Sequence, residues 1–507
     1  MIPIANALLF GTPRWAAGLA SVQAILMMVC VVPALGAHRP LALHPDNPHY
    51  FLWRGKPTIL ITSGEHYGAV LNLDFDYVRY LNTLAQDKLN LTRTFAGGAY
   101  VEPAGAFNID QNTLAPKAGR FLCPWSRSDQ PGYAGSGNKF DLSRWDESYF
   151  RRLRGFVAQA GKRGIVVELN FFCPFYEEAQ WRLSPFNLAN NVNGLGNVAR
   201  TNVYTLDKHG GLLAPQEKMA RRIVSELREF DNVYYEICNE PYFGGVTLAW
   251  QRHMASVITE AELSGAGFPP ARTGKRPGPL HLISQNIANN QAKIDNPDPA
   301  VSIFNFHYAA PPDTVAMNYK LNQVIGDNET GFRGTNNAPY RMEGWDFLVA
   351  GGGLYNNLDY SFTAGHEDGT FVYPASQPGG GNREFRKQMR ILRDFMSTFN
   401  FVKMKPDSSI IKGGVPPGLT ARALVEPGKA YAIYLRPALA AQSSKPKTED
   451  AAPLQVQLPA GRYRAEWIDP RSGRVAKAGK FKHTGGVRAL AVPALTEDMA
   501  LRIKASR

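Results

Sequence analysis

A carboxylate at the end of an apolar run is the first feature of this chain that could do chemistry. Residues 233–238 are mostly apolar and rich in residue types that favour strands, and Asn239, Glu240 and Pro241 follow them directly. Proline has no N–H to donate and therefore cannot continue a central strand. The pattern predicts a strand that ends before Asn239, with the Glu240 carboxyl group at its carboxyl end, where it could give or accept a proton.

A second carboxylate, Glu329, follows another apolar run that begins at Val324, and a small residue and Gly331 come after it. Two carboxyl groups about 5 Å apart can cleave a glycosidic bond with retention, because one transfers the proton while the other attacks the anomeric carbon. In that chemistry Glu240 and Glu329 would form the pair. The alternative for Glu329 is an exposed carboxylate on a loop.

Two further glutamates compete for these roles. Glu343 lies in the segment 341–349, whose periodicity is helical, so we expect it to be paired or solvated on a helix and prefer Glu329 as the nucleophile. Glu236 precedes Glu240 by an even number of residues and therefore shares its side of the strand. A carboxylate deeper in the protein needs a partner, which predicts an internal salt bridge or hydrogen-bond network for Glu236.

These residues need a scaffold that brings strand ends together. Apolar strands alternate with amphipathic segments of helical length, which predicts repeated βα units around a parallel sheet. The expected strands are 58–62, 89–95, 164–171, 233–238, 281–284, 302–306, 323–327 and 358–362. The expected helices are 76–86, 145–162, 215–230, 248–264, 341–350 and 383–399. Eight such units predict an α/β protein with a (β/α)8 TIM barrel, whose active sites lie at the carboxyl ends of the strands.

The two ends of the chain differ from this pattern. Arg14 precedes an apolar run that small residues follow, which predicts a secretory signal peptide over residues 1–37, with a membrane anchor as the alternative. Short alternating runs between turns predict a smaller antiparallel β-sandwich over residues 404–507. The barrel would then occupy residues 38–403. We expect a secreted or periplasmic protein without stable membrane insertion after signal cleavage.

Asn239-Glu240-Pro241 at the fourth expected strand resembles the motif of the clan-A, cellulase-like glycoside hydrolases. These are (β/α)8 barrels in which an Asn-Glu-Pro at the end of the fourth strand carries the acid/base glutamate, and many of them also carry a C-terminal β-module. The resemblance implies a retaining glycosidase that acts on an oligosaccharide or polysaccharide by double displacement, with Glu240 as acid/base and Glu329 as nucleophile. It implies neither a metal nor an organic cofactor.

The same resemblance implies supporting roles for residues at other strand ends. Arg93, at the end of the second strand, matches an arginine beside the nucleophile, and its charge would hold Glu329 ionised. Asn239 would hydrogen-bond the sugar 2-hydroxyl, a contact that strengthens in the transition state. His307 and Tyr308 match a His/Tyr element that could orient Glu329, although a core histidine is the alternative for His307.

Weaker candidates for sugar contact have ordinary structural roles as their alternatives. The polar ones are Glu65, His66, Asn170 and Asp359. The aromatic ones, which could stack on sugar faces, are Tyr100, Trp125, Tyr242, Phe243, Trp250 and Trp345. The aromatic pair beside Glu240 is the most suggestive.

Charge and cysteine content limit the partners. The chain has 56 Lys and Arg against 43 Asp and Glu, a net charge of +13. These basic residues are scattered along expected helix faces rather than interleaved with aromatic residues, so we expect no nucleic-acid partner. Cys123, Cys173 and Cys238 are too widely spaced for zinc or a disulfide framework, and we expect buried free thiols, with one disulfide bridge as the alternative.

Two other functions stay open at this point: a non-catalytic carbohydrate-binding barrel protein and a transglycosidase that uses the same residues. The sugar, its linkage and the choice between exo and endo action depend on the long loops at 96–140 and 172–208, which follow the second and third strands. The oligomeric state is likewise open.

Overall fold

The computed structural model describes residues 39–96, 100–264, 280–438, 452–495 and 497–506. The predicted signal peptide, residues 1–37, lies outside the described residues. Residues His38–Arg507 form one compact unit. The domain boundary expected after residue 403 therefore stays a prediction. Among the described helices, none has both the length and the apolar character that crossing a bilayer requires.

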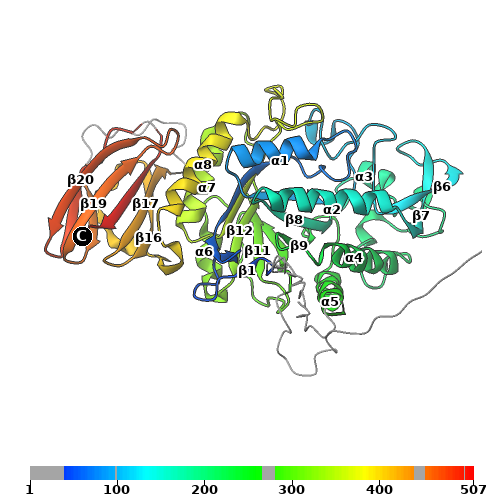
Figure 1. Cartoon of the computed structure of the whole chain (residues 1–507), viewed down its shortest axis with the longest axis horizontal. Helices are drawn as coiled ribbons and strands as arrows, with labels where there is room; N and C mark the ends of the chain where they lie inside the picture. Colours follow the sequence, from blue (N-terminus) through cyan, green and yellow to red (C-terminus); the bar gives the residue numbers. More distant parts are fainter. Residues whose placement is uncertain (1–38, 97–99, 265–279, 439–451, 496, 507) are drawn as a thin grey trace, which may run out of the picture. The chain divides into compact units, whose positions relative to one another are not determined.

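Eight parallel strands form the central sheet (Figure 1). Their order is β4-β13-β12-β11-β10-β9-β8-β5, so strands that follow one another in the chain are neighbours in the sheet. The strands are β4 (Leu60–Gly64), β5 (Leu91–Phe95), β8 (Val166–Phe172), β9 (Val233–Cys238), β10 (Ile283–Asn289), β11 (Ile303–His307), β12 (Val324–Glu329) and β13 (Leu354–Leu358). This arrangement confirms the predicted (β/α)8 barrel, whose carboxyl strand ends meet at one face.

Asn90 joins the two end strands of this sheet, β4 and β5. Its backbone N–H donates to the Ile61 carbonyl at 3.2 Å, and its side-chain oxygen accepts from the Ile61 N–H at 2.8 Å. Its side-chain N–H donates to the Ile59 carbonyl at 2.9 Å. An amide side chain carries both donors and an acceptor, so it can imitate a peptide group. Asn90 supplies at this seam the pairing that strand backbones supply elsewhere.

Helices follow most of the barrel strands, as the amphipathic segments predict, although no described helix lies between β10 and β11. They are α1 (Tyr77–Gln86), α2 (Glu147–Lys162), α3 (Glu178–Leu183), α4 (Leu213–Leu227), α5 (Leu248–Ser264), α6 (Asp313–Asn318), α7 (Asn337–Val349) and α8 (Arg383–Ser397). The helix α2 begins at the N-cap Asp146, whose side chain accepts from the Ser148 N–H, and it buries an apolar face that includes Leu153 and Phe156. Almost every residue of α7 is buried, because this helix contacts β13, α8 and the C-terminal strand β17 (Ala430–Pro437).

The predicted eighth strand at 358–362 was placed four residues too late. After α7 the chain turns through glycines and forms β13 at Leu354–Leu358. Asn356 and Asn357 interrupt the apolar pattern, which hid the strand in the sequence. In the structure the Asn356 amide N–H donates to the Asn328 carbonyl at 2.8 Å and the Asn357 amide N–H to the Thr330 carbonyl at 3.0 Å, so both donors are used inside the barrel wall.

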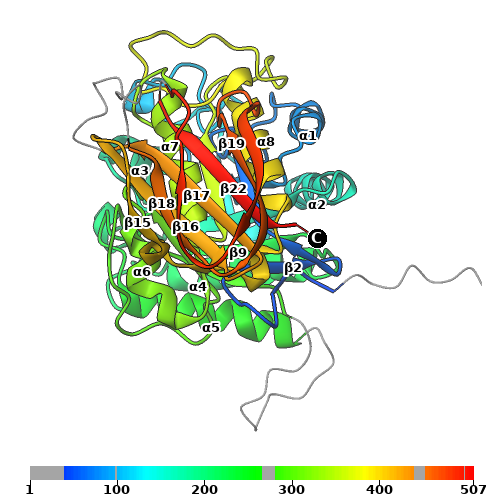
Figure 2. The ribbon, with the colours of Figure 1, turned by 90° about the vertical axis from the view of Figure 1, so that its left-hand side faces the viewer.

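Beyond the barrel the chain forms two antiparallel sheets (Figure 2). One has the order β14-β16-β17-β22-β19-β20 and the other β15-β18-β21. Their strands are β14 (Lys405–Pro406), β15 (Ile411–Gly413), β16 (Leu419–Glu426), β17, β18 (Leu454–Leu458), β19 (Gly461–Ile468), β20 (Val475–His483), β21 (Gly486–Leu490) and β22 (Met499–Ala505). Side chains of both sheets share one hydrophobic core that includes Ile433, Val456 and Leu501. The antiparallel C-terminal region is thus confirmed.

Two small sheets complete the described part of the chain. The strands β1 (Ala42–Leu43), β2 (Phe51–Trp53) and β3 (Lys56–Thr58) form one antiparallel sheet before the barrel. The strands β6 (Trp125–Pro131) and β7 (Asn138–Trp145) pair in the loop after β5.

Candidate active site

The two predicted catalytic carboxyl groups face each other at the carboxyl end of the barrel. Glu329 is the last residue of β12, and Glu240 lies two residues beyond the end of β9. One carboxyl oxygen from each and a ring nitrogen of His307 all lie within 4.8 Å of one another, and all three residues are buried. The parallel strands of the barrel all bring their carboxyl ends to one face, so residues 89 positions apart in the chain become a pair across the barrel although β10 and β11 separate their strands in the sheet.

Three donors hold the Glu329 carboxyl group in place. The Tyr308 hydroxyl donates to Oε1 at 2.8 Å, the Tyr67 hydroxyl donates to Oε2 at 3.0 Å, and the Arg93 guanidinium donates to Oε2 at 3.2 Å. An ionised carboxylate is acceptor-only, so a set made entirely of donors favours that form. The geometry suits a group that must attack as an anion.

The Glu240 carboxyl group receives different partners. The Tyr176 hydroxyl donates to Oε2 at 2.6 Å, and His307 Nδ1 lies 3.1 Å from Oε1. Burial acts to raise the pKa of Glu240, but the hydrogen bonds of His307 and Tyr176 and the charges of His307 and Arg93 outweigh it and leave this pKa below its usual value. Glu240 is also held at φ +36°, in the left-handed region that non-glycine residues seldom adopt.

Arg93 connects the site to the interior of the barrel. Its side chain is buried, and it donates to Asn239 Oδ1 at 2.6 Å as well as to Glu329. It also forms an ion pair with Glu236, and its Nε lies 4.0 Å from Glu168 Oε2. The predicted internal ion pair of Glu236 is therefore confirmed, and one cation faces three carboxyl groups.

The buried pair Glu168 and Glu236 lies between β8 and β9. Asn305 and Asn328 each donate to both carboxyl groups, at 2.6 to 2.9 Å. Burial and the charge of Glu236 raise the pKa of Glu168 well above its usual range. For Glu236, Arg93 and the hydrogen bonds overcome burial, so its pKa lies below its usual value. The interior therefore favours the neutral form of Glu168 and the ionised form of Glu236, an arrangement that avoids a second uncompensated charge.

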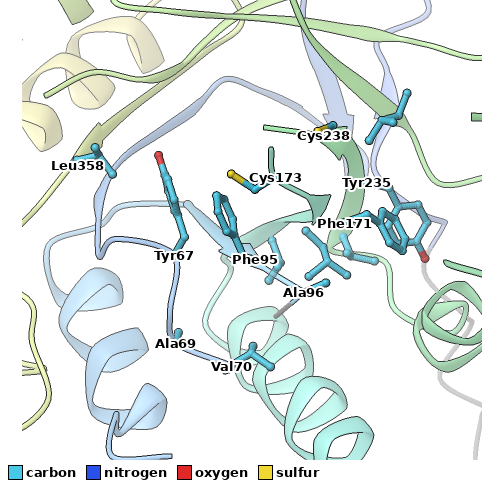
Figure 3. Close-up of a cluster of buried hydrophobic side chains, with 14 of the residues drawn as sticks. Tyr67, Ala69, Val70, Phe95, Ala96, Phe171, Cys173, Tyr235, Cys238 and Leu358 are labelled. Carbon is cyan, nitrogen blue, oxygen red and sulfur yellow. The ribbon is translucent and has the colours of Figure 1, made fainter. Parts of the chain in front are cut away.

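A cavity of about 470 Å³ opens above Glu240 and Glu329. Tyr67 and Phe95, which lie side by side near Cys173 in Figure 3, form part of its wall. The remaining lining residues are His66, Tyr100, Glu102, Phe107, Leu114, Cys173, Tyr176, Asn239, Phe243, Asn289, Tyr308, Gly331, Phe332 and Arg333. Eight of the lining side chains are phenylalanine or tyrosine. All three predicted thiols, Cys123, Cys173 and Cys238, are free and buried.

Within the described part of the chain, Glu240, His307 and Glu329 are the one group whose donor atoms converge closely enough to hold a metal ion. The oxygens of both glutamates already accept hydrogen bonds from tyrosines. The Arg93 guanidinium, 3.2 Å from Glu329, adds a positive charge that opposes a second cation. The donor set therefore fits a proton-transfer site better than a metal site.

The structure brings five of the predicted supporting residues to this site. Asn239 is fixed between Arg93 and Tyr176, whose hydroxyl lies 2.8 Å from Asn239 Nδ2. Tyr308 contacts Glu329 directly, whereas His307 lies nearer to Glu240 than to Glu329, at 3.1 Å against 3.6 Å. The remaining residue, His66, lines the cavity, and burial lowers its pKa to about 4.

Two of the weaker polar candidates lie outside the cavity. The Glu65 carboxyl group accepts from the backbone N–H groups of Gly68 and Ala69 and from the Thr113 hydroxyl, at 2.6 to 3.1 Å. It fixes the loop after β4 rather than facing the cavity. Asn170 is buried on β8 and does not line the cavity.

Asp359 and Trp345 are also structural residues here, which corrects their assignment as sugar contacts. The carboxyl group of Asp359 is buried in an ion pair with Arg386, at 2.7 Å. Trp345 is fully buried on α7, where its ring packs on Phe395 and stacks on Tyr434 of the C-terminal region. An aromatic residue on an amphipathic helix looks the same in sequence whether it packs in a core or binds a sugar.

The remaining candidates from the sequence are likewise either structural residues or residues at the cavity. Glu343 lies on α7 as expected and is paired, because it accepts from Arg333 at 2.7 Å and from Thr330 at 2.8 Å. Trp125 and Trp250 are buried in the core, away from the cavity. Tyr100 and Phe243 line the cavity, and Tyr242 lies beside Phe243 with its hydroxyl 3.4 Å from Glu240.

Sequence reasoning missed several residues of the site. Tyr67 and Tyr176 hold the two carboxyl groups, and Phe107, Glu102 and Phe332 line the cavity. Phe107 lies in a short 3-10 helix, Ala106–Asn108, and the other four lie on loops, where no periodicity fixes the direction of a side chain. The one available signal was position: Tyr67 and Tyr176 follow the ends of β4 and β8 by three and four residues.

No protein-family model and no curated protein sequence matches this chain. In structure it is similar to a glycoside hydrolase family 5 protein from Bacteroides vulgatus, at 14% identity and a TM-score of 0.59, over 92% of this chain and 93% of that chain. Another solved structure, a glycoside hydrolase, matches at 14% identity and a TM-score of 0.60, over 92% and 97% of the two chains. A candidate glycoside hydrolase from Bacteroides vulgatus matches at 14% identity and a TM-score of 0.63, over 92% and 83%. At this identity the matches establish a shared fold.

Proposed function

We propose that this chain, which has the fold of the matched glycoside hydrolases, is a retaining glycosidase with Glu240 as acid/base and Glu329 as nucleophile. The observation that carries the proposal is the spacing of the two carboxyl groups, whose oxygens approach within 4.8 Å. Retaining enzymes hold this pair about 5 Å apart, whereas inverting enzymes leave about 6.5 to 9.5 Å for a water molecule.

In the first step Glu329 attacks the anomeric carbon while Glu240 gives its proton to the glycosidic oxygen, which leaves with the aglycone. In the second step Glu240 takes a proton from water, and the resulting hydroxide releases the sugar from Glu329. Asn239, which Arg93 and Tyr176 hold in place, is the proposed contact for the sugar 2-hydroxyl. The three donors around Glu329 would hold its charge ready for attack.

The proton on Glu240 must change between the two steps, and the geometry offers a cause. Once Glu329 becomes an ester, a negative charge within 4.8 Å of Glu240 is lost. The loss of a nearby like charge favours ionisation, so Glu240 becomes the stronger acceptor that the second step needs. In the free enzyme the lowered pKa of Glu240 implies an acidic pH optimum, because the first step needs its protonated form.

The experiment that tests this assignment removes the nucleophile. Glu329→Gly should abolish turnover, and added azide should then give a glycosyl azide, because azide fills the space and attacks in place of the carboxylate. Proton NMR of the first product from the wild-type enzyme should show retained anomeric configuration. Wild-type activity in Glu329→Gly, or an inverted first product, would contradict the proposal.

Two alternatives are separated by the same measurements. A non-catalytic carbohydrate-binding protein would bind sugars without turnover at any pH. A transglycosidase would give the azide product but would transfer the sugar to acceptors in preference to water. Export by a signal peptide stays a prediction from residues 1–37, and it supports action outside the cytoplasm.

A further inference from the structure

Exposed phenyl rings surround the mouth of the cavity. Phe107, Phe243 and Phe332 line it, and their exposed fractions are 40%, 44% and 40%. Tyr242 beside them is 37% exposed. Large apolar side chains gathered around one opening mark a surface that a ligand covers.

Two of these rings are held at a backbone conformation that bulky residues avoid. Phe107 has φ +54° and Phe332 has φ +60°, in the left-handed region where glycine or asparagine is favoured. Strained positions of this kind gather at functional sites because folding alone gives no reason to retain them. The backbone thus supports a binding role for these rings independently of their exposure.

Phe107 and Phe243 lie on the same side of the cavity as Glu240, the proposed acid/base. Both rings lie edge-on to the ring of Tyr176, at 5.6 Å and 6.0 Å between centroids. The Tyr176 hydroxyl donates to Glu240 at 2.6 Å, and the Phe243 N–H donates to the Glu240 carbonyl at 2.9 Å. Because Glu240 protonates the leaving oxygen, the leaving group must lie against this side of the cavity.

Phe332 belongs to the opposite side. Its ring lies edge-on to Tyr308, which donates to the nucleophile Glu329 at 2.8 Å. The cavity therefore has matched phenyl rings near each of its two carboxyl groups, and the two sets can be tested separately.

The side of Glu240 offers a leaving group few hydrogen bonds. Phenyl rings carry neither donor nor acceptor, and the nearby Asn289 Oδ1 already accepts from the Tyr242 hydroxyl, which leaves the Asn289 amide N–H as the donor of this residue. The charged lining residues Glu102 and Arg333 are paired elsewhere, with Tyr100 and Glu343 respectively. A hydroxyl-rich leaving group would lose water here without replacement, which is unfavourable, whereas an apolar one would bury its surface.

We infer that the leaving-group side of this site takes an apolar aglycone, alkyl or aryl, rather than a second sugar. The inference rests on the proposed glycosidase function and names the class of substrate for it. The sugar lies over Glu329, and the group released with the proton of Glu240 lies on Phe107 and Phe243.

A series of alkyl glycosides tests the inference. The substrates are n-butyl and n-hexyl glycosides of glucose, galactose, mannose and xylose in both anomers, together with 4-nitrophenyl glycosides and disaccharides of the same sugars. Butyl and hexyl leaving groups have nearly the same intrinsic reactivity, so their ratio reports binding of the chain. Burial of two further methylene groups should raise kcat/KM about fifteen-fold from butyl to hexyl.

Alanine variants of phenylalanines on the two sides of the cavity provide the test and its control. In the double variant Phe107→Ala/Phe243→Ala the hexyl-to-butyl ratio should fall to about three or less, because the chain loses its apolar surface. Phe332→Ala removes an equally exposed ring from the nucleophile side and should keep the ratio near that of the wild type. Thermal melts confirm that each variant is folded.

The remaining outcomes separate the inference from the proposed function. A wild-type ratio near one, a disaccharide preferred over the hexyl glycoside, or an equal loss in Phe332→Ala would overturn the apolar aglycone while leaving the glycosidase intact. Failure to cleave any glycoside of the panel would contradict the glycosidase itself.

Discussion

Tyrosine hydroxyl groups orient both carboxyl groups of the proposed active site. Tyr67 and Tyr308 donate to Glu329, and Tyr176 donates to Glu240. A tyrosine keeps its proton at neutral pH, and burial raises the pKa of Tyr176 further, so its hydroxyl stays a donor. Each ring is itself packed in the cavity wall, which limits the freedom that a long polar side chain would have.

Tyr176→Phe should move the pH dependence of the proposed activity. The hydroxyl favours the ionised form of Glu240, so its removal raises the pKa of Glu240. The first step needs the protonated form, and the basic limb of the kcat/KM profile should therefore move to higher pH. We expect kcat to fall about ten-fold, the equivalent of one lost hydrogen bond of about 1.4 kcal/mol.

Tyr242→Phe is the matched control, because the Tyr242 hydroxyl lies 3.4 Å from Glu240 and is mainly bonded to Asn289. Its basic limb should stay close to that of the wild type. Equal shifts in the two variants would show that Tyr176 has no special influence on Glu240.

Residue types at strand ends were predictable, and those on loops were not. Glu240 and Glu329 could be placed from the sequence because a strand's end fixes the face on which its side chains lie. Arg93 was expected at a strand end and lies instead at the middle of β5. Tyr176 follows β8 on an irregular segment, so nothing in its spacing showed that it would reach Glu240. Trp345 was assigned wrongly because its helix buries every face.

Four strands of the barrel cooperate in one interior layer of polar side chains. Glu168 on β8, Glu236 on β9, Asn305 on β11 and Asn328 on β12 exchange hydrogen bonds inside the barrel. Glu236 in this layer forms an ion pair with Arg93 on the interior side, and Glu329 forms one on the cavity side. The barrel interior therefore takes part in setting the charge of the site.

Replacement of Glu168 and Glu236 by Gln should reveal their shared proton. Glu168→Gln should leave the pH profile of kcat/KM nearly unchanged, because Glu168 is already neutral. In Glu236→Gln the remaining Glu168 can ionise beside Arg93 and take over from Glu236 as the carboxylate that balances the charge of Arg93. In the double variant no interior carboxylate balances Arg93, so the pH profile should change more than in either single variant.

The measurement is the pH profile of each single variant and of the double variant, with thermal melts as the check on folding. Strong non-additivity is the expected signature of a shared proton. An acidic limb that moves as far in Glu168→Gln as in the double variant would contradict it.

Strand and helix positions followed closely from the sequence where apolar patterns are continuous. The strand β9 begins and ends at the predicted residues because an apolar run before proline leaves no other choice. The strand β13 was misplaced because its asparagines satisfy neighbouring carbonyls, a fact that depends on β12 and is invisible locally. Asn90, which joins β4 and β5, likewise has a role that depends on two distant segments.

At the scale of the whole molecule, buried carboxyl groups link folding to pH. Burial raises the pKa of Glu65 and that of Glu102 to about 7 each, while burial lowers the pKa of His66 to about 4. A carboxyl group with a raised pKa stays neutral in the fold while the unfolded chain ionises. Its contribution to stability is therefore present below the unfolded pKa and is lost as pH rises towards the folded one. The contribution of His66 to stability has the opposite pH dependence: it increases as the pH rises from about 4 to 6.5.

Glu102→Gln should reduce the loss of stability on going from pH 4.5 to pH 8. The pKa of Glu102 rises from 4.5 to about 7, so the wild type should lose about 3 kcal/mol through this residue, and the variant should not. The amide can keep the contacts with Tyr100 and Asn112. Urea denaturation at the two pH values measures the difference.

His66 also contributes to the change in stability between pH 4.5 and pH 8, and its contribution is the same in the variant and the wild type. The comparison between the two proteins therefore isolates the contribution of Glu102. An unchanged difference between pH 4.5 and pH 8 in Glu102→Gln would show that Glu102 is ionised in the fold.

The fold of the whole molecule could be predicted in outline from the sequence. Alternating strands and helices indicated the barrel, and short alternating runs indicated the antiparallel C-terminal region. The contact between them could not be predicted, because it depends on α7, where Arg341 pairs with Asp498 and Trp345 stacks on Tyr434. The two residues of each pair are more than 85 positions apart, and nothing in the sequence indicates that they are in contact.

The left-handed backbone at Glu240 has a consequence for how this barrel could change over time. A glutamate at φ +36° is retained against a conformational preference of about 1 to 2 kcal/mol. A lineage released from selection for turnover would gain stability by placing glycine at position 240, since glycine adopts this conformation freely. Under the proposed function, the residue at this position in a descendant of the chain would record whether catalysis is still being selected.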